Sequence, residues 1–179
     1  MMKLFRKALA YLRGEPQHLE KLLKRGLKVG KNFYRGGGVI IDTTHCYHIT
    51  IGDNVTLGPR VHILAHDAST AMFLGKTRAA NVTIGNQVFV GASAIILPGV
   101  HIGNRVIIGA GSVVTKDIPD NSVAVGNPAK VVCSLDAYLE KEKAKIRPEN
   151  TFKGLWWEHP KDIEKALAAA EEYGEIFVS

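Results

Sequence analysis

The residues of this chain best suited to chemistry are its histidines, of which the sequence holds seven. His66 stands apart because Asp67 follows it in the segment ILAHDAS, where the surrounding sequence pattern is interrupted. A neutral imidazole can take a proton from a substrate and return it near neutral pH. Asp67 could orient the ring, although adjacent side chains on an extended segment usually point apart. These features make His66 a candidate for proton transfer, with a solvated loop histidine as the alternative.

Metal binding is a second use for the same residue type. His62, His66 and His101 could supply the three protein ligands of a zinc site whose fourth position holds water. His62 and His101 occupy outward-facing places of the repeat described next, so they also fit plain surface residues. Both interpretations stay open at this point.

The element that must position these residues is a repeat of six residues between Ile84 and Ile118. A helix would place apolar residues three and four apart, and a single strand would alternate throughout, so neither fits. Glycine recurs at the second place, where the backbone can turn without obstruction by a side chain. We therefore predict very short strands joined by tight bends, which is a parallel β-helix. The first places are Ile84, Val90, Ile96, Ile102, Ile108 and Val114, and the fifth are Val88, Ala94, Val100, Val106, Ser112 and Ile118.

A weaker form of the repeat follows the glycines at 36–38. Counting in sixes from Val39 puts His45 at a nominally inward place. There its ring would either be held by hydrogen bonds within the core or contact a substrate molecule. The register then fails between Ile63 and Ile84, which are 21 residues apart. An interruption of this size predicts a loop that projects from the solenoid over residues 66–81.

Helices are expected on both sides of the solenoid. Residues 1–35 are predicted to form a basic helical cap, with amphipathic helices over 2–13 and 17–25 that cover an open end of the β-helix. The solenoid would occupy 36–133. A helical extension would follow over 134–179, with helices at 135–146 and 160–173 and with Trp156 and Trp157 as packing anchors.

Charge and cysteine content limit the function classes. Ten of the 23 Lys and Arg residues lie in the first 35 positions, against two Glu. The chain lacks the aromatic interleaving and finger spacing of nucleic-acid binders, so no nucleic acid is expected, and peripheral membrane contact through the basic N-terminus stays open. Cys46 and Cys133 show neither pairing nor metal spacing, and no secretory signal is evident. We expect a cytoplasmic protein, with the inner face of the membrane as an option.

Three segments together resemble the hexapeptide-repeat acyltransferases, in particular the galactoside and maltose acetyltransferases and the O-acetyltransferases of surface polysaccharides. The segments are TIGDNVTLGP, the run from NVTIGNQVF to GSVVTKDIPDN, and AVGNPAKVV. The resemblance implies a left-handed parallel β-helix of about four coils, an exception to the right-handed crossover rule. It also implies a homotrimer that takes acetyl-CoA and the acceptor in clefts between subunits, with acetyl-CoA as the acyl donor and no metal.

The resemblance also assigns site residues. His66 matches the catalytic histidine and would act as general base in a direct transfer without an acyl-enzyme. Asp42 lies where relatives carry acidic or amide residues near the acceptor, and a turn-capping Asp is the equal alternative. With Asp67 and His45, it forms the expected acceptor-binding set. The cofactor contacts carry over to Ala92, Ala110, Thr115, Lys116 and Lys130, whereas Cys133 stands where some relatives have a basic residue.

The expected function is therefore acetyl transfer from acetyl-CoA to a sugar hydroxyl, on a precursor of a surface polysaccharide or lipopolysaccharide. An alcohol is a poor nucleophile at neutral pH, and a histidine base removes that difficulty. One alternative is a zinc enzyme of the γ-type carbonic anhydrase class, built on the same solenoid. A non-catalytic scaffold is the other alternative, and binding of acetyl-CoA would argue against it.

Overall fold

A computed structural model describes residues 19–153 and 160–178 of the chain. The chain divides into two compact units, Met1–Leu135 and Asp136–Ser179, which are described separately below. The predicted helix over 2–13, as well as Trp156 and Trp157, lie outside the described residues.

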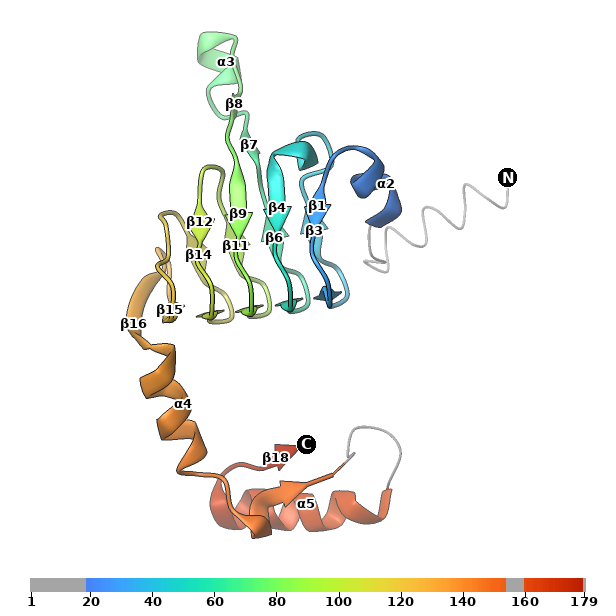
Figure 1. Ribbon diagram of the computed structural model, residues 1–179, viewed down its shortest axis with the longest axis vertical. Coiled ribbons are helices and arrows are strands. Elements are labelled where there is room, and N and C mark those ends of the chain that lie inside the picture. Colours follow the sequence, from blue (N-terminus) through green and yellow to red (C-terminus); the bar gives the residue numbers. More distant parts are fainter. Residues whose placement is uncertain (1–18, 154–159, 179) are drawn as a thin grey trace, which may run out of the picture. The chain divides into compact units, whose positions relative to one another are not determined.

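The first unit is a solenoid whose strands form three parallel sheets (Figure 1). Each turn of the chain contributes one strand to each sheet, and the described strands make four coils before Ile118 and β15 begin another. The first sheet holds β1 (Lys28–Val29), β4 (Ile49–Ile51), β9 (Val82–Ile84) and β12 (His101–Ile102). The second holds β2 (Tyr34–Arg35), β5 (Val55–Leu57), β10 (Val88–Val90), β13 (Val106–Ile108), β15 (Ser122–Val125) and the antiparallel β16 (Lys130–Ser134). The third holds β3 (Ile40–Ile41), β6 (His62–Ile63), β11 (Ile95–Ile96) and β14 (Val113–Val114).

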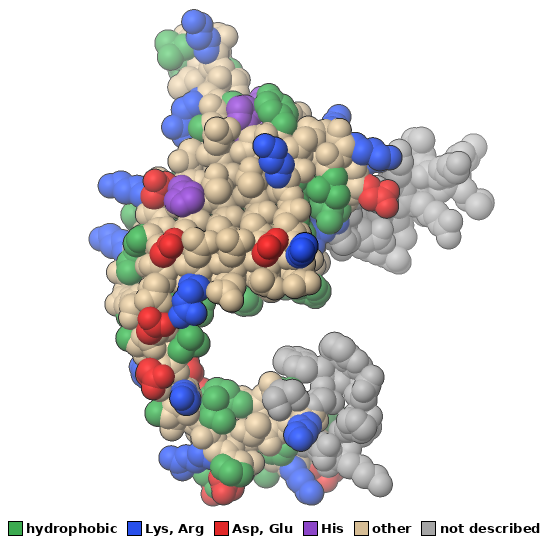
Figure 2. Space-filling model, in the orientation of Figure 1, with side chains coloured by type: hydrophobic (Ala, Val, Ile, Leu, Met, Phe, Trp, Pro, Cys, Tyr) green, Lys and Arg blue, Asp and Glu red, His purple; other side chains and the backbone are tan. Residues whose placement is uncertain are grey.

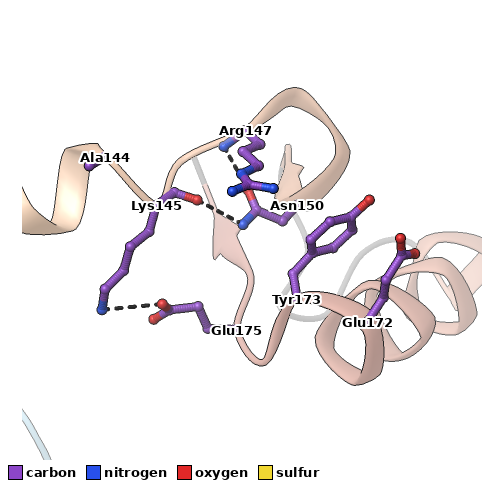
Figure 3. Close-up of a pocket in the computed structure, with 7 residues that line it drawn as sticks. All are labelled: Ala144, Lys145, Arg147, Asn150, Glu172, Tyr173 and Glu175. Atoms are coloured by element: carbon purple, nitrogen blue, oxygen red, sulfur yellow. Dashed lines mark hydrogen bonds and ion pairs between the residues drawn. The ribbon is translucent and has the colours of Figure 1, made fainter.

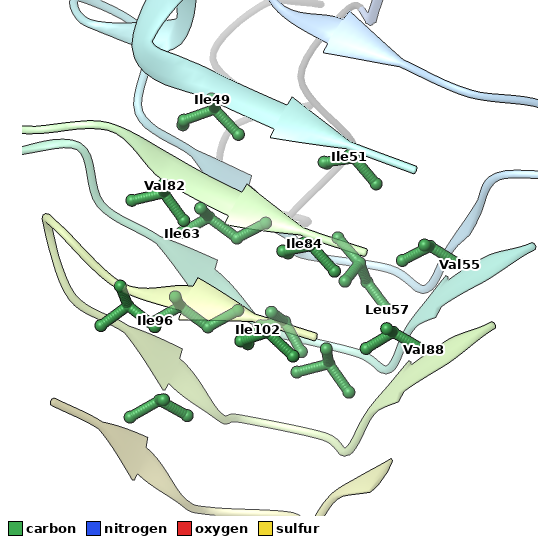
Figure 4. Close-up of a cluster of buried hydrophobic side chains, with 14 of the residues drawn as sticks. Ile49, Ile51, Val55, Leu57, Ile63, Val82, Ile84, Val88, Ile96 and Ile102 are labelled. Atoms are coloured by element: carbon green, nitrogen blue, oxygen red, sulfur yellow. The ribbon is translucent and has the colours of Figure 1, made fainter. Parts of the chain in front are cut away.

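The core is a column of Ile, Val and Leu side chains inside the three sheets. The strand register stacks the same position of the repeat in successive coils. Ile51 pairs with Ile84, and Ile84 pairs with Ile102. These side chains are 0–2% exposed, and Figure 4 shows them stacked coil on coil. Burial of one such side chain stabilises the fold by about 1.5–3 kcal/mol, so the repeat itself supplies the core.

The glycines at the second place of the hexad are needed because neighbouring coils approach closely. Their φ angles are not positive, contrary to the turning role that the sequence suggested. A Cβ on Gly85 would lie 2.7 Å from the carbonyl oxygen of Gly103 in the next coil. The left-handed conformation falls two residues later, at Gln87 (φ 55°) after Gly85 and at Arg105 (φ 55°) after Gly103.

One corner of the solenoid carries a ladder of Asp and Asn side chains. Each side-chain oxygen accepts a backbone N–H from the corresponding residue of the preceding coil, which satisfies donors that the bend removes from the sheets. The steps are Lys31 to Asp53 (2.7 Å), Asp53 to Asn86 (2.8 Å), Asn86 to Asn104 (2.9 Å) and Asn104 to Asp120 (2.7 Å).

Two features of the predicted register differ from the structure. The solenoid begins at Lys28, before the expected boundary at residue 36, because β1 pairs with β4 and β2 with β5. Ile41 pairs with Ile63 and is the inward residue of its hexad. From Ile41 to Ile51 the chain takes ten positions, where Ile96 to Ile102 takes six. The first coil therefore has four extra residues at one corner, and this insertion moves His45 out of the core.

The first end of the solenoid is covered by α2 (Leu19–Lys24), which falls within the predicted helix over 17–25. Leu22 and Leu27 are 2% and 3% exposed and belong to the core cluster, so this segment closes the end of the apolar column. None of the helices in the described part of the chain is both long and apolar enough to cross a membrane.

The second unit contains α4 (Leu135–Lys143), η2 (Pro148–Asn150), β17 (Thr151–Phe152), α5 (Pro160–Tyr173) and β18 (Phe177–Val178). The predicted helix over 160–173 agrees with α5, and α4 ends three residues before the predicted 146. A cavity of about 350 Å³ lies here between Lys145, Arg147, Tyr173 and Glu175 (Figure 3). Lys145 pairs with Glu142 at 3.0 Å and Glu175 at 3.2 Å, so its charge is compensated within the unit.

Replacement of Gly85 by Ala is expected to destabilise the solenoid, because the new methyl group meets the backbone of the next coil. Overpacking of this kind costs about 1–3 kcal/mol. Gly37→Ala is the matched control, since a Cβ there would have no neighbour within 4 Å, and it should be neutral or slightly stabilising. Urea unfolding of both variants measures the difference. Equal stability of the two variants would contradict the close-approach explanation.

Candidate active site

Two insertions leave the solenoid at the same corner in successive coils. Asp42 to His48 follows β3 and includes the 3₁₀ turn η1 (Cys46–His48), while the second insertion starts at His66 beyond β6. Since β3 and β6 are neighbours in one sheet, the two segments begin side by side. His48 Nδ1 lies 2.6 Å from Asn81 Oδ1 and links the end of the first insertion to the end of the second.

The second insertion is a β-hairpin with a helical tip, where the sequence predicted only a loop. β7 (His66–Asp67) pairs antiparallel with β8 (Arg78–Ala79), and α3 (Ala71–Leu74) lies between them (Figure 1). His66 therefore stands on a hydrogen-bonded strand at the base of the hairpin. Figure 2 shows histidine at the surface near this base.

Asp42 organises the corner. Its side chain is 1% exposed, yet both carboxylate oxygens are fully engaged. Oδ1 accepts the backbone N–H of Thr44 (3.1 Å), the hydroxyl of Thr44 (3.0 Å) and the N–H of His45 (3.0 Å). Oδ2 accepts the N–H of Ala65 (3.1 Å) and faces Nδ1 of His66 in a short hydrogen bond. One carboxylate thus ties the first insertion to the second.

These contacts keep Asp42 ionised. Burial alone raises the pKa of a carboxyl group, but the hydrogen bonds from His66, His45, Ala65 and Thr44 outweigh it and lower the pKa of Asp42 from 3.8 to about 2. An ionised carboxylate can only accept, so Nδ1 of His66 must carry the hydrogen that it donates. In the neutral imidazole, Nε2 of His66 then has the lone pair that a general base requires.

His45 is tied to the same carboxylate through a hydroxyl. Its Nδ1 lies 2.9 Å from Oγ1 of Thr44, and that hydroxyl gives its single hydrogen to Asp42. Nδ1 of His45 is therefore the donor in this contact, and its Nε2 is also free to accept. The rings of His45 and His66 are 4.5 Å apart between centroids, with side chains 27% and 33% exposed.

The structure changes the interpretation of both acidic candidates. Two roles were expected for Asp42, contact with the acceptor or capping of a turn, and the structure shows the second: its buried carboxylate caps the turn and also holds His66. Asp67 does not orient His66. Its Oδ1 accepts the N–H of Ser69 at 2.8 Å, because neighbouring side chains on β7 point to opposite sides.

A possible metal-ligand set among the described residues is Asp42, His45 and His66, with one ligand atom from each within 4.8 Å of the others. It differs from the predicted trio, since His62 lies on β6 and His101 on β12 in another sheet. A cation bound by all three would have to displace hydrogen bonds from a carboxylate that already accepts five. The donor set therefore fits an oriented base better than a metal centre.

The predicted cofactor residues gather at one end of the solenoid. Ala92 and Ala110 lie on turns of successive coils, where Gly111 N–H donates to the Ala92 carbonyl at 2.8 Å. Thr115 and Lys116 are exposed just after β14, in the sheet whose earlier strands lead to Asp42 and His66. Lys130 is exposed at the start of β16, and Ala129 beside it donates to the Val113 carbonyl at 2.8 Å. These five residues thus lie around β14. In its sheet, β14 is two strand spacings, or about 10 Å, from β6, the strand that precedes His66.

Sequence reasoning missed Thr44 and the pairing of Asp42 with His66. The signal that could have found them is the distance from Ile41 to Ile51, which is four residues longer than one hexad. The insertion was overlooked because Val39, two hexads before Ile51, is also apolar and suggested an uninterrupted repeat.

Replacement of Asp42 by Asn should destabilise the protein by about 2 kcal/mol at pH 7, the difference that its pKa of about 2 represents against 3.8 when unfolded. A depressed carboxyl pKa stabilises the fold above the unfolded value, and this contribution disappears as pH falls through the folded value. The gap between wild type and Asp42→Asn should therefore close between about pH 4 and pH 2. Urea unfolding across pH 2–7 measures it, with Asp67→Asn as a partly exposed control. A pH-independent gap would contradict the assigned ionisation.

Comparison with known proteins agrees with this geometry. The family described as bacterial transferase hexapeptide (six repeats) matches residues 81–116. Protein CapG of Staphylococcus aureus is 47% identical over 128 residues, which cover 68% of this chain and 74% of CapG. Galactoside O-acetyltransferase of Escherichia coli is 42% identical over 113 residues, or 59% of this chain, but the match spans only 53% of that enzyme.

A solved structure described as galactoside acetyltransferase in complex with coenzyme A superposes with a TM-score of 0.52 at 32% identity. The match covers 76% of this chain and 82% of the solved one. The expected fold class, a left-handed parallel β-helix with a protruding insertion and flanking helices, is confirmed. The chain belongs to the hexapeptide-repeat acyltransferases, a family of acetyltransferases.

Proposed function

We propose that this protein is an acetyl-CoA-dependent O-acetyltransferase that modifies a hydroxyl of a sugar, on a precursor of a surface polysaccharide or lipopolysaccharide. The observation that carries the proposal is the hydrogen bond between the buried Asp42 carboxylate and Nδ1 of His66, which in the neutral ring leaves the lone pair on Nε2. A carboxylate can also orient a zinc-bound histidine, but the predicted zinc ligands His62 and His101 lie on β6 and β12, in different sheets of the chain. A scaffold would have no use for an oriented imidazole.

The transfer follows from that tautomer. Nε2 of His66 takes the proton of the acceptor hydroxyl as its oxygen attacks the thioester carbonyl carbon. Asp42 stabilises the imidazolium that forms without itself taking the proton. When the tetrahedral intermediate collapses, the C–S bond breaks and Nε2–H returns its proton to the coenzyme A thiolate. The products are the acetyl ester and free coenzyme A, with no acyl-enzyme.

The donor side is proposed around β14. Backbone groups at Ala92, Ala110, Thr115 and Lys116 would accompany the extended pantetheine arm, and the exposure of Ala110, Thr115 and Lys116 and the partial exposure of Ala92 leave room for it. Lys130 would pair with a phosphate as a point charge. The similarity to a solved galactoside acetyltransferase in complex with coenzyme A supports coenzyme A as the donor carrier.

A homotrimer is proposed as the active form. In the single chain Met72, Phe73 and Leu74 at the tip of α3 are 86%, 80% and 69% exposed. Three neighbouring apolar side chains of this size favour cover by a partner. A neighbouring subunit at this hairpin would also close a cleft over His66.

Replacement of His66 by Ala should lower kcat on the best sugar acceptor by roughly 10²–10⁴-fold, since general-base assistance is lost. Asp42→Asn should also lower kcat, because the wrong tautomer becomes available, whereas Asp67→Asn should stay near wild type. Release of coenzyme A thiol, followed with acetyl-CoA and a panel of glycosides, measures all three. Near-normal turnover of His66→Ala would refute the base assignment, and Asp67→Asn as slow as Asp42→Asn would refute the pairing.

Replacement of Lys130 by Ala should raise KM for acetyl-CoA with little change in kcat, because a uniform binding contact is removed. An acetyl donor that lacks the 3′-phosphate tests whether Lys130 binds that phosphate. If it does, the KM values of the variant and of wild type should differ less with this donor than with acetyl-CoA. Lys31→Ala, at the far end of the solenoid, is the control. An unchanged KM for acetyl-CoA would show that Lys130 does not contact the donor.

A further inference from the structure

The first insertion exposes two side chains, His45 and Tyr47, that the proposed base His66 does not need for its orientation. His45 adds a second imidazole beside His66, with its Nδ1 engaged by Thr44 and its Nε2 free. Tyr47 follows on the same turn, 54% exposed, and its ring lies 6.0 Å from His45 and 4.5 Å from His48 between centroids. The transfer mechanism assigns no task to either residue.

This insertion is held to the rest of the solenoid by contacts along its length. Cys46 is fully buried, with Sγ 3.6 Å from the carbonyl oxygen of Leu22, and Arg25 Nη1 donates to the Thr43 carbonyl at 3.0 Å. His48 is held by Asn81, as described above. Fixed side chains with free polar edges and an exposed aromatic face are the ingredients of a specific small-molecule site.

We propose that the segment Thr44–His48 recognises the acceptor as a pyranose with two neighbouring hydroxyl groups. The proposal rests on the O-acetyltransferase function and deepens it. His66 Nε2 takes the proton of one hydroxyl, and His45 Nε2 accepts a hydrogen bond from the next one along the ring. Tyr47 offers its face to the apolar C–H face of the sugar, as amphipathic aromatic rings do in binding sites.

The arrangement explains why both imidazoles are tied to one carboxylate. Asp42 Oδ2 fixes the tautomer of His66 directly, and Oδ1 fixes that of His45 through the Thr44 hydroxyl. Both rings therefore turn an acceptor nitrogen outward, and both match O–H donors on one substrate. A site built to accept a hydrogen bond discriminates against an analogue that lacks the donor, because its acceptor is left unpaired.

The test uses the 179-residue chain, acetyl-CoA and a pair of glycosides. One is the best pyranoside acceptor found with wild type, and the other lacks the hydroxyl next to the acetylated position. Wild type should prefer the parent glycoside by about tenfold or more in kcat/KM. His45→Phe keeps a ring but no acceptor, so the preference should fall to about one, with kcat/KM on the deoxy sugar little changed. His45→Gln, which can still accept, should restore part of the preference.

Control measurements separate recognition from structure. Thermal unfolding and KM for acetyl-CoA should be unchanged in these variants, and His101→Ala should behave as wild type on both sugars. A fall of equal size on both glycosides would overturn the proposal, since His45 would then only support His66. If no sugar is acetylated by wild type, or if His66→Ala stays active, the proposed function itself fails.

Tyr47 is tested separately. Tyr47→Ala should raise KM for the parent glycoside several-fold, Tyr47→Phe should not, and turnover of a simple alcohol should be the same in both. Equal KM values for the glycoside in Tyr47→Ala and wild type would remove Tyr47 from the site.

Discussion

The buried carboxylate of Asp42 is the interaction on which the site depends. It gathers five hydrogen-bond donors from four residues in two coils. An uncompensated carboxylate at 1% exposure would be costly, and here that cost is offset by charge-assisted hydrogen bonds. The same bonds decide which nitrogen of each histidine carries hydrogen. The stability of this corner and the orientation of the proposed base therefore depend on one group.

The solenoid makes this precision possible. Ile and Val side chains in register, the glycines that let coils approach and the Asp and Asn ladder together fix the position of every corner. Asp42 and Ala65 stand one strand spacing apart on the exit side of the same sheet, so a side chain from one coil reaches the backbone of the next. The proposed donor site lies on the same sheet, near β14.

Much of the fold could be predicted from the sequence, because a hexad is a local pattern that directly encodes one side of a coil. The position of His66 at an interruption was also readable. The partner of His66 was not, because Asp42 lies 24 positions earlier and meets it only through coil stacking. Asp67 is adjacent in sequence, but neighbouring side chains on a strand diverge, and Asp67 caps its own turn instead. His45 was wrongly predicted to point inward, because apolar residues on both sides of the four-residue insertion made the hexad register look continuous.

The location of both insertions at one corner has a consequence for how such a protein can diversify. Residues added there leave the pairing of β3 with β6 and of β4 with β9 intact, so the length and composition of these segments can vary while the scaffold stays the same. The wall near β14 is untouched by such changes. If the proposed assignments hold, a single framework can exchange one acceptor for another by changes in a few surface residues, while the proposed donor site near β14 stays the same.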